Sequence, residues 1–333
     1  MIKNILSLKH PIWFMRQAGR HLPEYLKIRK NFKSFLDFCY SYESVIESTL
    51  QPIKRYDLDC AIVFSDILVI PYILNQKIEF IEGKGPILSP INLTSDLSLK
   101  VNNNKNRKLE NTYNSIVQIR KKLHKNKSLI GFCGGPWTVA CYMIDGSSKT
   151  KFVKSRELLN NDKSHLLALL DIIVNVSVNH LEKQYLSGCD TLMIFESWAG
   201  LVPKKSQDEI LYNPTKKIIY KLREKNITAP IICFPKGINK EITSYNREVK
   251  PDVLSIDHNI DIQWLIKNIE EETILQGNIN PNTLLKGGNP LKREILKLKS
   301  IVKERKHIFN LGHGILPKTP IENVLKAIEL IRK

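Results

Sequence analysis

The chain has 333 residues, of which 42% are hydrophobic and 25% are charged. These are ordinary values for a globular protein, and the length fits two average domains or one large α/β barrel. They exclude a disordered chain, a collagen-like chain and a small scaffold held together by disulfides.

Apolar runs and cysteines bear on the cellular setting. No apolar run approaches the ~18 residues that a membrane-spanning helix needs. Residues 1–10 lack the apolar core and the cleavage site of a signal peptide. The six cysteines form no C-x-x-C pair, so we expect neither disulfides nor a cysteine-rich zinc site. We therefore expect a cytoplasmic protein without membrane contact.

The net charge of +18 is the unusual value of this composition. A basic chain suits nucleic-acid binding, or an acidic substrate that is drawn into a basic cleft. The lysines are scattered, as at Lys121-Lys122 and Lys204-Lys205, and form no block interleaved with aromatic residues. We attribute most of the excess to a composition rich in Lys, Ile and Asn, and expect no nucleic-acid partner.

Short apolar, β-branched runs alternate along the chain with helical patterns. Continuous apolar runs are typical of strands buried on both faces, and the alternation favours parallel β–α units. The expected strands are residues 12–15, 61–64, 129–132, 191–195, 231–234, 253–256, 273–275 and 308–311. The expected helices are residues 111–123, 164–186, 207–222, 262–270, 290–303 and 320–331, and residues 102–110 are an expected exposed loop. Eight strands predict a single (β/α)8 TIM barrel over residues 1–333, with a doubly wound open sheet as the alternative.

Polar and ionisable residues follow most of these strands. Arg16 and Arg20 follow the first, Asp66 the second, Lys236 the fifth and His313 the eighth, while Gly277-Asn278 ends the seventh. Turns favour Gly, Pro, Asn and Asp, but have no need of arginine, lysine and histidine. In a (β/α)8 barrel the carboxyl ends of the strands share one face. The pattern therefore predicts an active-site cleft on that face.

Arg16 and Arg20 flank the tripeptide Gln17-Ala18-Gly19. A guanidinium fork binds a carboxylate or phosphate through two hydrogen bonds, and Gly19 would let the backbone approach a ligand closely. Arg29 is a third candidate cation. The alternative for these arginines is a set of surface salt bridges.

Asp66 lies between two apolar runs, which indicates partial burial. Burial disfavours an ionised carboxyl group unless donors or cations compensate. Asp66 could be a general base, a metal ligand or a hydrogen-bond acceptor, and its alternative role is a helix N-cap. His313 lies in a Gly-His-Gly turn, and Asp257 could orient His258. Tyr142 could present its phenol to the site or belong to the core.

Five blocks of sequence resemble the uroporphyrinogen decarboxylase family. They are RQAGRHLPEY (16–25), FSDIL (64–68), GPWT (135–138) followed by Tyr142-Met143, FES (195–197) and NLGHGI (310–315). They occur in the order of the family, so the resemblance covers nearly the whole chain. His21 departs from the tyrosine common at that position, and no position assigned to the chemistry is changed.

The resemblance implies a homodimeric (β/α)8 enzyme that needs neither metal nor organic cofactor. It implies that four acetate side chains of uroporphyrinogen III each lose CO2 to give coproporphyrinogen III. Asp66, Arg16 and Arg20 carry over as catalytic residues, and Asp66 matches the carboxylate that meets the pyrrole N–H groups. The substrate-binding residues carried over are Arg16, Gln17, Ala18, Gly19, Arg20, Arg29, Asp66, Tyr142, Phe195, Ser197 and His313.

Two other functions compete with this interpretation. A zinc-dependent, corrinoid- or folate-linked methyltransferase on a related barrel would need His and Cys at the strand ends. The fifth strand end, CFPK (233–236), has no histidine, and His313 has no neighbouring cysteine. A nucleic-acid-binding protein would bind DNA or RNA with strong salt dependence, but the scattered lysines disfavour it.

Overall fold

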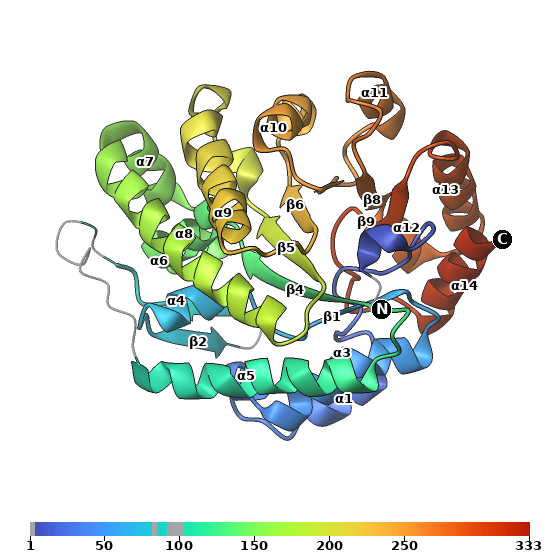
Figure 1. Ribbon diagram of the computed structural model, residues 1–333, viewed down its shortest axis with the longest axis horizontal. Coiled ribbons are helices and arrows are strands. Elements are labelled where there is room, and N and C mark those ends of the chain that lie inside the picture. Colours follow the sequence, from blue (N-terminus) through green and yellow to red (C-terminus); the bar gives the residue numbers. More distant parts are fainter. Residues whose placement is uncertain (1–3, 82–84, 92, 94–102) are drawn as a thin grey trace.

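The computed structural model describes residues 4–81, 85–91, 93 and 103–333 (Figure 1). One curled parallel sheet organises them, with its strands adjacent in the order β1, β4, β5, β6, β7, β8 and β9. These are β1 (Cys60–Ile62), β4 (Ser128–Gly134), β5 (Thr191–Glu196), β6 (Ile231–Pro235), β7 (Val253–Ser255), β8 (Leu275–Ile279) and β9 (His307–Leu311). A separate antiparallel hairpin consists of β2 (Ile78–Ile81) and β3 (Gly85–Leu88). The α/β class with a parallel sheet is thereby confirmed.

The described sheet has seven strands, not the eight that we expect from the sequence. Residues 12–15 form only one bridge, from Ile12 to Phe309 in β9. Side chains take two of their N–H groups, because Ile12 N–H donates to Asp59 Oδ2 (2.7 Å) and Met15 N–H donates to Asn310 Oδ1 (3.0 Å). The backbone hydrogen bonds between residues 12–15 and β9 therefore do not continue as a regular strand ladder.

This N-terminal segment nevertheless touches both edges of the sheet. Trp13 N–H donates to Phe309 O in β9 (3.2 Å). On its other side, Asp59 N–H, just before β1, donates to Ile12 O (2.9 Å). Residues 11–13 thus lie in the gap between the first and last strands of the curled sheet.

Helices pack around the outside of the sheet (Figure 1). The longer ones are α3 (Tyr42–Arg55), α5 (Asn103–Lys122), α6 (Pro136–Asp145), α8 (Lys163–Leu186), α9 (Asn213–Glu224), α13 (Gly288–Ile301) and α14 (Ile321–Arg332). The shorter ones are α1 (Pro23–Arg29), α2 (Phe35–Cys39), α4 (Val69–Ile73), α7 (Val153–Asn161), α10 (Ile242–Val249), α11 (Ile262–Lys267) and α12 (Pro281–Lys286). Single turns are η1 (Ile5–Ser7), η2 (Ser148–Thr150), η3 (Ala199–Leu201), η4 (Lys204–Ser206), the π-helical η5 (Asp208–Tyr212) and η6 (Asn239–Glu241).

Residues 103–110, an expected loop, form the first part of α5, while Asn102 lies outside the described residues. The reason is an apolar face that begins earlier than the predicted helix. Leu109, Tyr113 and Ile116 are all buried, at the spacing of four and three residues that one face of a helix requires. This contact with the core outweighs the polar composition around it.

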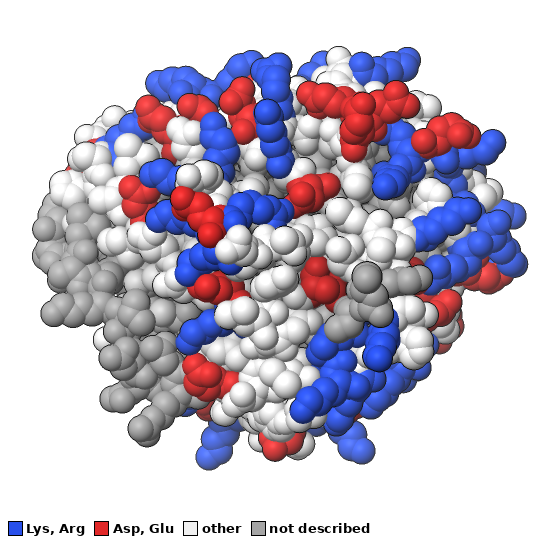
Figure 2. Space-filling view, in the orientation of Figure 1, with Lys and Arg blue, Asp and Glu red and all other residues white. Residues whose placement is uncertain are grey.

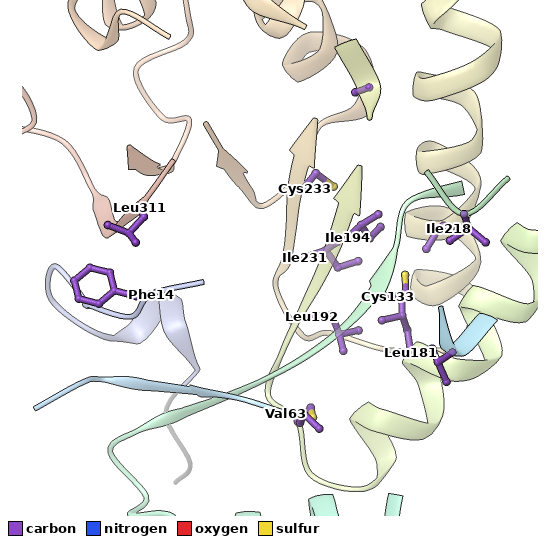
Figure 3. Packing of buried hydrophobic residues seen from close by; sticks show 14 of the residues in the cluster. Phe14, Val63, Cys133, Leu181, Leu192, Ile194, Ile218, Ile231, Cys233 and Leu311 are labelled. Carbon is purple, nitrogen blue, oxygen red and sulfur yellow. The ribbon is translucent and has the colours of Figure 1, made fainter. Parts of the chain in front are cut away.

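The sheet carries a hydrophobic core on each face. On the helix side, Leu192 and Ile194 of β5 and Ile231 of β6 lie close to the helices (Figure 3). On the concave side, Met193 and Ile232 from the same strands pack with Trp13. Successive side chains of a strand point to opposite faces, which explains this division. The η1 turn adds to the concave core, and Ile5 N–H donates to Thr191 Oγ1 (3.4 Å) at the amino end of β5.

Helix α8 is the one described helix that is long and apolar enough to cross a membrane, with a mean hydropathy of 1.3 over its best window. This corrects the expectation that no apolar run approaches that length. Buried residues such as Leu170, Ile173 and Leu181 pack α8 into the main core, and 56% of that window is buried. We interpret α8 as a core helix.

Charged side chains are spread over the visible face of the molecule rather than collected in one block (Figure 2). Lys and Arg occur across the visible face with Asp and Glu between them (Figure 2). Several exposed lysines have acidic partners, as in the ion pairs Lys217–Asp171 (2.6 Å) and Lys225–Glu182 (2.7 Å). Exposed pairs of this kind contribute at most about 1 kcal/mol to stability. The six cysteines are all buried and unpaired.

Candidate active site

The predicted polar residues gather at the carboxyl end of the sheet. Arg16 and Arg20 follow the segment between β9 and β1, Asp66 follows β1, and His313 follows β9, while Tyr142 is carried by α6. Asp66, Arg20 and Tyr142 all affect the pKa of Arg16, and Arg16 affects that of His313. The fold therefore brings these five residues together from distant parts of the sequence.

Asp66 is half-buried, and its two carboxylate oxygens have different surroundings. Oδ1 accepts a hydrogen bond from Leu68 N–H (2.8 Å). Asp66 is nevertheless not a helix N-cap, because the N-cap residue of α4 is Leu68. Oδ2 has no hydrogen-bond partner among the described residues. Burial raises the pKa of Asp66, although the Leu68 N–H and the charge of Arg16 act in the opposite direction. A ligand that donates hydrogen bonds to Asp66 would therefore stabilise its ionised form.

Arg16 combines an unusual backbone conformation with a guanidinium group that has no partner among the described residues. Its φ of +59° lies in the left-handed region, which costs a non-glycine residue roughly 1–2 kcal/mol. Gly314 gives its side chain room, because a Cβ added to Gly314 would lie 2.3 Å from Arg16 Cδ. The side chain of Arg16 is exposed to solvent, but protein atoms surround much of it. This partial desolvation lowers the pKa of Arg16, and the charge of Arg20 lowers it further. Neither arginine forms an ion pair with any residue that the structure describes.

The tripeptide between these arginines has a positioning role. Gln17 is buried, its Oε1 accepts from Phe14 N–H (3.1 Å) and its Nε2 donates to Cys60 O (3.0 Å). A Cβ on Gly19 would lie 2.9 Å from the carbonyl oxygen of Arg16, so the turn needs glycine. Ala18 packs against the main core. These residues hold the loop that carries Arg16 and Arg20.

Arg29 lies beside the cluster with part of its guanidinium occupied. Its Nη1 donates to Phe32 O (2.5 Å), and its guanidinium carbon lies 5.9 Å from the centre of the Phe35 ring. Burial raises the pKa of Tyr25, and Arg29, Arg20 and Asp66 all act on that phenol. Arg29 therefore contributes positive charge near the site and also supports the end of α1.

Aromatic and hydroxyl groups complete the predicted set. Phe195, at the end of β5, packs edge to face against Phe132 (5.4 Å between ring centroids) and Phe234 (6.3 Å) on the concave side of the sheet. Ser197, which follows β5, has a hydroxyl group with no hydrogen-bond partner in the described part of the chain. Tyr142 is half-buried, and burial raises the pKa of its phenol. At neutral pH this phenol is a hydrogen-bond donor.

His313 is a neutral imidazole at neutral pH. Burial lowers its pKa to about 3, and the charges of Arg16, Lys236 and His258 act in the same direction. A neutral ring can donate one hydrogen bond and accept another. His313 is therefore suited to orienting a polar group of a ligand rather than to supplying a proton.

The structure corrects two details of the strand ends. Gly277 and Asn278 lie inside β8, and the Asn278 amide donates to Asp257 O (3.1 Å) and Ile260 O (2.9 Å). Asp257 does not orient His258, because its carboxylate accepts from the N–H groups of Gly237 and Asn259 (2.8 Å each). The ring of His258 instead lies 3.3 Å from Gly312 O.

Glu196 is a supporting residue that the predicted site lacks. It is 1% exposed, and its carboxylate accepts from Trp137 N–H (3.2 Å) and Thr138 N–H (2.6 Å) at the start of α6. Burial raises the pKa of Glu196 to about 7. Because α6 carries Tyr142, this contact positions the phenol. An acid at a strand end was the available signal, but its partner could not be read from sequence.

Other parts of the described surface are less suited to chemistry. A groove of about 610 Å³ between α8 and α9 is lined by Leu167, Asp171, Lys217 and Tyr220 among others, on the outside of the molecule. A second, of about 370 Å³, lies between α13 and α14. Among the described residues, no three His, Cys, Asp or Glu side chains gather as a metal site requires.

Comparisons with known proteins identify the family of the chain. The model of the family described as uroporphyrinogen decarboxylase (URO-D) matches residues 7–333. Uroporphyrinogen decarboxylase of Rickettsia africae is 44% identical over 97% of this chain and 93% of that protein. The Orientia tsutsugamushi protein of the same name is 44% identical over 97% and 94%. A methyltransferase from Methanosarcina mazei shares the fold, with a TM-score of 0.76, 17% identity and coverage of 99% and 93%. The chain thus belongs to the uroporphyrinogen decarboxylase family.

Proposed function

We propose that the cluster around Asp66 removes CO2 from the four acetate side chains of uroporphyrinogen III and yields coproporphyrinogen III. The observation that carries this proposal is a half-buried Asp66 beside the guanidinium group of Arg16. Among the described residues, Asp66 Oδ2 has no hydrogen-bond partner and Arg16 has no ion-pair partner. Membership of a decarboxylase family supports the reaction class.

Substrate and site are complementary in charge and in hydrogen bonding. Uroporphyrinogen carries eight carboxylates, which attract and bind the fork-shaped groups of Arg16 and Arg20. Its four pyrrole N–H groups are donors, and an ionised carboxylate has about four lone-pair sites. Asp66 can therefore accept hydrogen bonds from all four N–H groups beneath a domed macrocycle. Phe195 would contact the apolar parts of the ring.

The reaction needs an electron sink next to each acetate arm. Protonation of a pyrrole ring carbon gives a cationic ring, and the bond between the arm and its carboxylate carbon then breaks. The electron pair of that bond neutralises the ring as CO2 leaves, and an exocyclic methylene forms. Protonation of the methylene and loss of the ring proton give the methyl group. Asp66 stabilises the cationic intermediate electrostatically.

Arg16 and Arg20 are assigned first to carboxylate binding and second to proton delivery. A guanidinium group with a pKa above ~12 is a reluctant acid at neutral pH. Desolvation and the charge of Arg20 lower the pKa of Arg16, although the charge of Asp66 acts in the opposite direction. A lowered pKa makes the guanidinium group a stronger acid. No metal or organic cofactor takes part in this scheme.

The same proposal covers the architecture. Residues 11–13 would take the place of the eighth strand and close a (β/α)8 barrel. Residues 1–333 would form a single domain. The continuous sheet and the hydrogen bonds of residues 11–13 to both of its edges support this view. A homodimer and a cytoplasmic location, both implied by the family resemblance, remain predictions that sedimentation and cell fractionation can test.

The direct test is turnover by the purified protein. Uroporphyrinogen III is kept reduced and dark, stray metal is chelated, and the products are oxidised and separated by chromatography. We expect products with seven, six, five and finally four carboxylates. Intact substrate in the presence of folded protein would overturn the proposal.

Arg20→Ala should mainly weaken substrate capture. We expect kcat/KM to fall at least tenfold, with most of the change in KM, because the variant loses one charge-assisted contact with a carboxylate. The loss should be larger at low ionic strength, since salt screens the attraction in the wild-type protein. Arg247→Ala, at an exposed arginine of α10, is the control. A loss that does not depend on salt would argue against this role.

A further inference from the structure

Lys236 lies across the sheet from the two site arginines. It directly follows β6, the middle strand of the seven, with three strands on either side. The loop of Arg16 and Arg20 follows residues 11–13, which hydrogen-bond to β9 and next to β1. Because the sheet curls until these edges share that segment, Lys236 and the arginines approach the site from opposite sides.

The backbone of Lys236 is fixed, whereas its ammonium group is available. Its N–H donates to Glu196 O (3.1 Å), and its carbonyl accepts from Gly200 N–H (3.0 Å). The half-buried side chain places Nζ 5.9 Å from the centre of the Trp198 ring. Lys217 and Lys225 on the outer helices have acidic partners. Lys236 has none among the described residues.

The side chain of Lys236 also extends toward the predicted site. Its charge and that of Arg16 both lower the pKa of His313, so both cations lie near the same imidazole. A half-buried ammonium group without an acidic partner is costly to desolvate. An anionic group of a ligand would compensate for that cost.

We propose that Lys236 binds a carboxylate arm of the substrate, on the side of the macrocycle opposite to Arg16 and Arg20. This inference rests on the proposed function and adds a specificity residue to it. The carboxylates radiate around the whole ring, so cations on one side alone leave arms on the other side unpaired. A lysine acts as a point charge and binds a carboxylate in many orientations. It can therefore hold successive arms as the macrocycle turns between decarboxylations.

The test compares two lysines that each lie over an indole ring. Lys236→Met removes the charge at similar length, and Lys240→Met does the same at an exposed lysine 5.5 Å from the Trp264 ring. We expect Lys236→Met to raise KM for uroporphyrinogen III about tenfold with a smaller change in kcat. Lys236→Arg should restore most of the affinity. Lys240→Met should leave KM at the wild-type value.

An equilibrium measurement separates this inference from the proposed function. Binding of coproporphyrinogen III, which still carries four carboxylates, is followed by protein fluorescence without turnover. Weaker binding by Lys236→Met, but not by Lys240→Met, would support the contact. Equal affinity of wild type and Lys236→Met, with unchanged KM, would overturn it even if wild type decarboxylates normally. Absence of wild-type turnover would instead overturn the proposed function. If Lys236→Met fails to fold, Lys236→Gln is measured in the same way.

Discussion

Asp66→Asn should fold normally and lose most of its turnover. The amide keeps an oxygen that can accept the hydrogen bond from Leu68 N–H, but it has no negative charge to stabilise the cationic pyrrole. Loss of one preorganised electrostatic group costs about 10²-fold or more in rate. The measurement is kcat/KM for uroporphyrinogen III, and a near-wild-type value would contradict the assigned role of Asp66.

Stability and pH dependence provide independent readouts for the same variant. Burial raises the pKa of Asp66 in the folded protein, so its ionisation disfavours folding at any pH above its pKa in the unfolded chain. At neutral pH, Asp66→Asn should therefore be at least as stable toward urea as wild type. Asp66→Ala, which also loses the acceptor for Leu68 N–H, should be less stable by roughly 1 kcal/mol than Asp66→Asn.

The pH dependence of activity is a second readout. Wild-type kcat/KM should fall at acidic pH as Asp66 takes up a proton, and this acidic decrease in the pH profile should be absent in Asp66→Asn.

Gly314→Ala should impair the reaction by displacing Arg16. The new Cβ would lie 2.3 Å from Cδ and 2.6 Å from Cγ of Arg16. These atoms are in the middle of the side chain, whose backbone is already held in the left-handed region. To avoid this clash, the Arg16 side chain must adopt another conformation, which displaces its guanidinium group. A displacement of about 1 Å at a catalytic group lowers the rate roughly 10²-fold. We expect a loss of that order in kcat/KM with folding retained.

A double-mutant cycle tests whether Gly314 acts through Arg16. In the Arg16→Ala background, the added methyl group has no side chain to displace, so Gly314→Ala should cost little more. Strong non-additivity of this kind indicates coupling of the two positions. If the two losses multiply instead, Gly314 affects activity by some other route. Urea unfolding of each variant separates a loss of structure from a loss of geometry.

The central strands could be predicted from sequence because a buried parallel strand is apolar throughout. β4, β5 and β6 lie within two residues of the expected bounds. Residues 12–15 are equally apolar but end as a bridged segment, because Asp59 and Asn310 occupy N–H groups that a ladder would use. Such side-chain competition depends on residues that are close only in the folded chain.

The candidate site, too, could be predicted from the sequence only in part. Strand ends and the family blocks led to Arg16, Asp66 and His313, which the fold does bring together. They could not indicate that Gln17 uses both ends of its side chain inside the protein, nor that Glu196 caps α6. These roles depend on distances between elements, which neither periodicity nor spacing contains.

The placement of residues 11–13 between β9 and β1 also affects how the molecule assembles. Trp13 N–H donates a hydrogen bond to Phe309 O, although the two residues come from opposite ends of the chain. Contacts of such high sequence separation form late, because the loop entropy of the whole intervening chain opposes them. During synthesis, Arg16 emerges early, yet its supports Gly314 and Asn310 leave the ribosome among the last residues. We therefore expect partly synthesised chains that lack Asn310 and Gly314 to have no complete site, because both residues support the arginine loop.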